Sequence, residues 1–184
     1  EKSAGLKLEA KALGEMIVTK ESKSLVNIYF LTEASKGLGK AAKDRISDAH
    51  ITVIGAGIMG AGIANSYARA GNQVLVRDMN EESLKRGKDH VTKELQKLRY
   101  LSRSERAAAG AKIEWSCWPT ETLKRTDLII EAVFESMDLK KKIFSELAKE
   151  IREDAVLASN TSSLSITEMA SVIPNPSRVI GMHF

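Results

Sequence analysis

The chain has 184 residues, 43% of them hydrophobic and 28% charged, which is enough for one packed α/β domain with an appendage but short for two full domains. The formal charge of +4 is small and dispersed, which argues against a nucleic-acid partner, and no stretch approaches the roughly 20 apolar residues needed to span a bilayer. The single cysteine, Cys117, excludes an intramolecular disulfide and a cysteine-based zinc cluster, so we expect no metal site and a half-buried strand residue there.

The first 48 residues predict two helices. Apolar side chains recur at helical spacing over residues 6–17 and 22–36, with Thr19 or Ser22 available as an N-cap between them. A charged stretch with two glycines follows, and short apolar strands begin after it. We therefore predict a helical linker over residues 1–48 and a second domain over residues 49–184. The start of the chain lacks an initiator methionine and a signal-peptide pattern, so we also expect a fragment of a longer protein.

The second domain alternates predicted strands with predicted helices. Apolar runs predict six strands, at residues 51–54, 73–77, 112–118, 127–134, 155–158 and 178–184. Helical spacing predicts helices at residues 58–70, 139–151 and 164–173, and either one extended helix or a helical pair inserted at residues 80–108, after the second strand. This alternation predicts an α/β fold with a doubly wound, mostly parallel sheet.

A glycine motif lies between the first of these strands and the helix that follows. The sequence Gly55-Ala56-Gly57-Ile58-Met59-Gly60 matches G-x-G-x-x-G, the fingerprint of Rossmann dinucleotide-binding units. The first glycine permits the turn, and the second lets the backbone approach a pyrophosphate at the helix N-terminus. The third lets the helix pack closely on the strand. The alternative is a glycine turn with a packing role only.

An acidic residue completes the fingerprint. Asp78 stands 18 residues after Gly60, at the end of the second predicted strand. Its carboxylate can accept hydrogen bonds from the adenosine ribose and would repel a 2′-phosphate, which favours NAD over NADP as the cofactor. The preceding Arg77 weakens this preference slightly.

Polar residues follow the later strands at the edge where ligands bind in such sheets. Glu135 and Lys140 follow the fourth strand, Asn160 and Ser162 follow the fifth, and His183 stands at the end of the sixth. The alternative for residues 159–163 is a run of helix-capping residues. A lone histidine in an apolar strand is often structural, but the position of His183 would face the nicotinamide end of a dinucleotide.

The predicted insertion is locally basic. Residues 81–112 contain nine Lys or Arg against five Asp or Glu. This excess could attract a phosphate-rich ligand, but a solvated helix face is the commoner explanation of such an excess.

Four segments together carry a resemblance to a known family. They are residues 54–60 (IGAGIMG), 130–135 (IEAVFE), 159–164 (SNTSSL) and 181–184 (GMHF). In this order they resemble the NAD-binding domain of the L-3-hydroxyacyl-CoA dehydrogenases across residues 51–184, and specifically the multifunctional form of these enzymes. Residues 6–36 resemble the last helices of the enoyl-CoA hydratase portion that precedes this domain in multifunctional fatty-acid oxidation proteins.

The resemblance implies roles for the polar residues at the sheet edge. The activity it implies is NAD-dependent oxidation of (3S)-3-hydroxyacyl-CoA to 3-ketoacyl-CoA in fatty-acid β-oxidation. His183 would be the general base, Ser162 would hydrogen-bond the substrate oxygen, and Asn160 would position cofactor or substrate. Glu135 and Lys140 match positions that contact NAD, and residues 80–108 resemble the segment that helps hold the CoA moiety.

The resemblance also implies what the chain lacks and what it associates with. The glutamate that orients the catalytic histidine and the helical domain that binds substrate and forms a homodimer would lie beyond Phe184, so we expect poor turnover by this chain alone. A thiolase subunit is an implied partner, and a bacterial cytoplasm is favoured over an organelle matrix. Two alternatives are kept, a dehydrogenase of free 3-hydroxy acids and a non-catalytic NAD-binding sensor or scaffold module.

Overall fold

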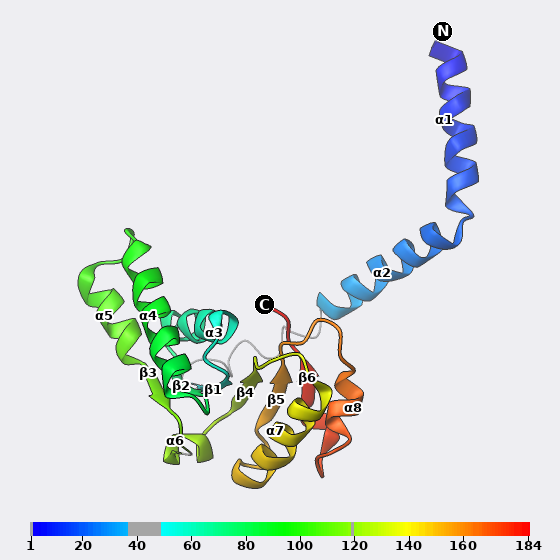
Figure 1. Ribbon diagram of the computed structural model, residues 1–184. Helices are drawn as coiled ribbons and strands as arrows, with labels where there is room; N and C mark the ends of the chain where they lie inside the picture. The colour runs from blue at the N-terminus through cyan, green and yellow to red at the C-terminus, as the bar shows by residue number, and fades with distance from the viewer. Residues whose placement is uncertain (1, 37–48, 119) are drawn as a thin grey trace. The chain divides into compact units, whose positions relative to one another are not determined.

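The computed structural model describes residues 2–36, 49–118 and 120–184 of the chain (Figure 1). The chain divides into two units, Glu1–Ile46 and Ser47–Phe184. The boundary that the sequence predicts near residue 48 lies outside the described residues.

The first unit contains the two predicted helices, α1 (Lys2–Ile17) and α2 (Lys20–Lys36). Between them, the Thr19 hydroxyl accepts a hydrogen bond from the Ser22 N–H at 3.1 Å, so Thr19 is the N-cap of α2. Neither helix buries a residue.

The second unit is built on a sheet of six strands. These are β1 (His50–Ile54), β2 (Gln73–Arg77), β3 (Ile113–Ser116), β4 (Leu128–Glu131), β5 (Val156–Ser159) and β6 (Val179–Gly181). Their order is β3-β2-β1-β4-β5-β6, and all five pairings are parallel. The predicted doubly wound sheet is therefore confirmed, and it is more regular than the mostly parallel sheet that was expected.

Helices cover both faces of this sheet, because successive apolar side chains of each strand point to opposite faces and both faces must be buried. Val74 and Val76 of β2 pack under α3 (Ile58–Arg69), α4 (Glu81–Lys97) and α5 (Arg103–Ala111). Leu75, between them, packs on the opposite face with Phe144 of α7 (Met137–Glu150) and Met169 of α8 (Ile166–Ala170). The strands thus lie in the middle layer of three, as Figure 1 shows.

Capping residues determine where the inserted and later helices begin. Residues 80–108 form a helical pair, because Ser102 makes a capping box with Glu105 and starts α5 anew. The predicted helix over residues 164–173 shortens to α8, whose N-cap is Ser165. A four-residue helix, α6 (Glu121–Lys124), was not predicted.

Several predicted strands are longer than the observed ones. The run over residues 127–134 ends at Glu131 because its own carboxylate accepts the Val133 N–H at 2.7 Å, which takes that group out of the sheet. The run over residues 178–184 is shortened at both ends, since a 3-10 turn occupies Pro176–Arg178 and β6 ends at Gly181. His183 accordingly lies two residues beyond the last strand.

Candidate dinucleotide and substrate site

The strand order reverses between β1 and β4, and the predicted site residues lie at the carboxyl ends of the strands around this point. In open α/β sheets the loops at this switch point diverge to opposite faces and leave a crevice for ligands. The loop after β1 contains the glycine motif, and the loop after β4 contains Glu135.

The three motif glycines have different structural requirements. Gly55 has a φ of +103°, in the left-handed region that favours glycine. A Cβ on Gly60 would lie 1.9 Å from the Gly55 carbonyl oxygen, so α3 can approach β1 only with glycine there. A Cβ on Gly57 would meet nothing within 4 Å, so packing does not require this glycine. The open space at Gly57 is what close approach by a ligand needs.

The N-terminus of α3 fits an anionic group. Its N-cap is Gly57, which supplies no side-chain hydrogen bond to the helix. The first N–H groups of a helix have no partners within the helix and carry the positive end of its dipole. Ile58 and Met59, 76% and 45% exposed, begin this helix at the surface. The pyrophosphate of NAD therefore fits both the space and the charge.

Asp78 fixes the glycine loop through hydrogen bonds to backbone N–H groups. Its Oδ2 accepts the Ala56 N–H at 2.8 Å, and its Oδ1 accepts the Asn80 N–H at 3.0 Å. Each carboxylate oxygen can accept a second hydrogen bond, so the predicted contact with a ribose hydroxyl stays compatible with this geometry.

A glycine that the sequence reasoning did not consider supports the same loop from outside. A Cβ on Gly87, within α4, would lie 2.7 Å from the Ala56 carbonyl oxygen and 2.9 Å from Cζ3 of Trp115. The helix can therefore lie on the loop only with glycine at this position. The available signal was a glycine inside a predicted helix, where it costs about 1 kcal/mol relative to alanine.

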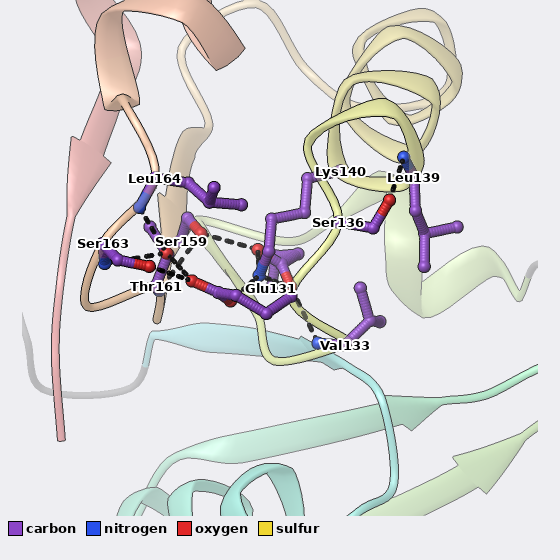
Figure 2. Close-up of polar contacts among 10 residues, drawn as sticks. Glu131, Val133, Ser136, Leu139, Lys140, Ser159, Thr161, Ser163 and Leu164 are labelled. Carbon is purple, nitrogen blue, oxygen red and sulfur yellow. Dashed lines mark hydrogen bonds and ion pairs between the residues drawn. The ribbon is translucent and has the colours of Figure 1, made fainter.

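A buried ion pair lies beside the crevice (Figure 2). Glu131 ends β4 and is fully buried, and Lys140 of α7 is 1% exposed. The Lys140 Nζ lies 2.8 Å from both carboxylate oxygens of Glu131. The Ser159 hydroxyl of β5 donates to the same carboxylate at 2.6 Å. The pair therefore joins β4, β5 and α7 through hydrogen bonds that compensate for burying both charges.

The same lysine reaches the more exposed Glu135. Its Nζ lies 3.2 Å from Glu135 Oε2, and the Glu135 side chain is 45% exposed. The hydroxyls of Thr161 and Ser163 donate to Glu135 Oε1. The Thr161 hydroxyl, followed by contact with the Lys140 cation, holds the pKa of Glu135 below its ordinary value. Lys140 is thus already engaged by two carboxylates, so we expect it to act on the cofactor through Glu135.

In the loop after β5, one hydroxyl caps the backbone N–H groups that follow it, and the neighbouring serine is exposed to solvent. Thr161 Oγ1 accepts the N–H groups of Ser163 and Leu164, at 3.3 and 3.0 Å, as the capping alternative for this segment expects. The Ser162 side chain, inside this turn, is exposed. Asn160 is different, because its carboxamide oxygen accepts the backbone N–H of Phe184 at 3.0 Å.

The structure brings the candidate residues together in three groups. Asp78 lies with the glycine loop, Glu135 lies with Lys140, and Asn160 lies with the segment that carries His183. No hydrogen bond joins Ser162 to the His183 imidazole within residues 49–118 and 120–184. The partners Glu131 and Ser159 were not assigned from the sequence.

The described residues contain no group of three or more His, Cys, Asp or Glu side chains placed to hold a metal ion. None of their helices combines the length and apolarity needed to cross a membrane.

Comparison with known proteins identifies the second unit. Residues 50–184 match the family profile described as "3-hydroxyacyl-CoA dehydrogenase, NAD binding domain". Among solved structures, the chain is similar to FadB2 of M. tuberculosis (37% identity, TM-score 0.71) and to the (S)-3-hydroxybutyryl-CoA dehydrogenase PaaH1 of Ralstonia eutropha (38% identity, TM-score 0.71), with 75% of this chain and 50% of the other covered in each case.

A third similar structure is the dehydrogenase part of multifunctional enzyme 1 from C. elegans, at 28% identity and a TM-score of 0.67, with 75% of this chain and 32% of the other covered. This chain spans about half the length of FadB2 and of PaaH1. The profile covers most of the chain, and the matched range includes the glycine loop and Asp78. The chain belongs to the 3-hydroxyacyl-CoA dehydrogenase family, and residues 50–184 are its NAD-binding domain.

Proposed function

We propose that this chain supplies the cofactor domain for NAD-dependent oxidation of (3S)-3-hydroxyacyl-CoA to 3-ketoacyl-CoA in fatty-acid β-oxidation. The observation that carries the proposal is the convergence, at one edge of the sheet, of an anion-binding glycine loop with the polar loops after β4, β5 and β6. A site that only bound a nucleotide would need the first of these and not the others.

The roles of the residues follow from their chemistry and from the family. The chemistry that NAD supplies when bound is acceptance of a hydride from a carbon that bears a hydroxyl group. His183, which is exposed, accepts the proton of that hydroxyl, since an imidazole exchanges protons near neutral pH. Ser162 donates a hydrogen bond to the same substrate oxygen. Glu135 orients the cofactor, and Lys140 and Thr161 hold Glu135 in its ionised form.

The helical insertion supports a CoA thioester as the substrate. The outer face of α4 and Arg99, two residues beyond its end, form a surface hollow of about 650 Å³, lined by His90, Lys93, Glu94, Gln96, Lys97 and Arg99. Three of these side chains are cationic and one is anionic. Their net positive charge suits the phosphates of CoA, and we propose that the insertion helps to hold them.

We also propose that this chain alone turns over substrate slowly. The chain spans about half the length of FadB2 and of PaaH1. Among the described residues, no side chain makes a hydrogen bond to the His183 imidazole. A catalytic base without a fixed orientation, in a site open to water, loses much of the rate gained from positioning and desolvation.

The wider assembly is part of the same proposal. The similarity to the dehydrogenase part of a multifunctional enzyme supports a multifunctional protein, and within this proposal we assign residues 1–48 to the end of a hydratase portion. A homodimer and a thiolase subunit as partners, and a bacterial cytoplasm as the compartment, stay predictions from the family resemblance.

The test uses a form of the protein that extends beyond Phe184. We expect NADH formation from (3S)-3-hydroxybutyryl-CoA and little from free 3-hydroxybutyrate. His183→Gln should abolish it while NAD affinity is unchanged, and the control is His50→Gln, because His50 begins β1 at the end opposite the glycine loop. Equal use of the free acid would favour a 3-hydroxy-acid dehydrogenase. No NADH from either substrate, with normal NAD binding, would favour a sensor or scaffold module.

A further inference from the structure

The chain remains extended beyond the end of β6. The Met182 N–H donates to the Ser159 carbonyl oxygen at 3.0 Å, which continues the ladder between β5 and β6. Two residues later, the Phe184 N–H donates to Oδ1 of Asn160 at 3.0 Å, so an amide side chain replaces the next backbone acceptor. His183 therefore lies between two anchored backbone N–H groups.

Side chains alternate between the two faces of the sheet along this segment. Val179 packs in the cluster that contains α7 and α8, and a Cβ on Gly181 would lie 3.2 Å from Cγ1 of Ile166 in α8. Met182 packs on the other face, against the cluster that contains α3. By the same alternation, His183 belongs on the α8 face, which is the face of the loop that carries Ser162.

Tyr67 of α3 contacts the residues on both sides of His183. Its hydroxyl donates to Sδ of Met182 at 3.6 Å, and its ring meets the Phe184 ring edge to face, with centroids 6.2 Å apart. Burial raises the pKa of Tyr67, so its hydroxyl stays protonated and can donate throughout the neutral range. The Tyr67 side chain of α3 thus holds both Met182 and Phe184 on the α3 face of the sheet.

We propose that Tyr67 is a positioning residue for His183. By keeping Met182 and Phe184 on the α3 face, it turns the intervening imidazole to the α8 face, toward the Ser162 loop. Because α3 also starts at the glycine loop, the same helix would locate both the cofactor and the base. The inference rests on the proposed function only for the catalytic role of His183; the orientation of the ring is a separate claim.

The orientation can be measured by proton NMR without cofactor or substrate. The chain has three histidines, so substitutions at His50 and His90 identify the ring signals of His183. In the unsubstituted chain we expect nuclear Overhauser contacts from the His183 ring to protons of residues 162–166 and none to Tyr67. Tyr67→Leu should remove them, whereas Tyr67→Phe, which retains the ring contact with Phe184, should retain most of their intensity.

The matched control is Tyr100→Leu, because Tyr100 is 70% exposed and its hydroxyl contacts only Arg69 among the described residues. It should leave the contacts unchanged. If Tyr67→Leu does not fold, Met182→Ala removes the same contact from the other side and should give the same loss. Ring contacts to Tyr67, no ring contacts in the unsubstituted chain, or contacts unchanged in a folded Tyr67→Leu chain would each overturn the proposal. Failure of the proposed oxidation would leave these signals unaffected.

Discussion

Replacing Lys140 with methionine should cost much of the stability of the second unit. The substitution keeps the length of the side chain but removes the cation that lies 2.8 Å from both oxygens of the fully buried Glu131. The remaining donors to that carboxylate are the Val133 N–H and the Ser159 hydroxyl. Removing one partner of a buried ion pair costs roughly 3–5 kcal/mol, because the other charge stays buried without compensation. Domains are stable by only about 5–15 kcal/mol.

The assay is urea unfolding followed by circular dichroism, with three variants compared. Lys140→Met should lower the free energy of unfolding by roughly 3–5 kcal/mol. Adding Glu131→Gln removes the uncompensated charge and keeps an oxygen for the Val133 N–H, so the double variant should regain about 2–3 kcal/mol of that loss. Lys141→Met is the control, since its ion pair with Glu168 is partly exposed and should contribute about 1 kcal/mol or less. A loss below 1 kcal/mol for Lys140→Met, or no recovery in the double variant, would refute this reasoning.

Three further predictions concern the crevice. Gly57→Ala should change the free energy of unfolding by no more than about 0.5 kcal/mol and yet weaken NAD binding in a calorimetric titration. Gly60→Ala should lower the free energy of unfolding in urea by at least about 1–3 kcal/mol, because the new Cβ would lie 1.9 Å from a carbonyl oxygen. Equal effects of the two would show that the glycines only pack. Gly87→Ala should lower both the melting temperature and NAD affinity although alanine favours helices, since its Cβ would lie 2.7 Å from the Ala56 oxygen. A higher melting temperature for Gly87→Ala than for the unsubstituted chain would contradict this prediction. The lowered pKa of Glu135 stabilises the fold above the unfolded pKa of about 4.3, and this contribution disappears as pH falls through the lower folded value. The stability difference between the unsubstituted chain and Glu135→Gln should therefore shrink on acidification below about pH 4, and a constant difference would argue against the ionised form.

The local pattern of the sequence was sufficient for most of the fold. Apolar runs and helical spacing located all six strands, and the strand over Gln73–Arg77 was predicted to the residue. The glycine motif could be interpreted because strand, glycines and helix are consecutive. Strand ends were less predictable, since they depend on individual hydrogen bonds such as the one that Glu131 accepts from the Val133 N–H.

Contacts between distant segments could not be predicted in the same way. The sequence placed Lys140 at the edge of the sheet, but its partners depend on how α7 packs on β4 and β5. The face on which His183 lies depends on the register of β6 against β5, and Tyr67 has no feature in the sequence that connects it with residue 182. These relations exist only in the folded sheet.

The central claim, that the glycine loop and Asp78 form an NAD site, is tested most directly by calorimetric titration of the chain with NAD and, separately, with NADP. The account predicts binding of both with clearly tighter binding of NAD, and a loss of this preference in Asp78→Asn, because the carboxylate charge that repels a 2′-phosphate is then absent. Binding of neither nucleotide by the folded chain, or tighter binding of NADP, would contradict it.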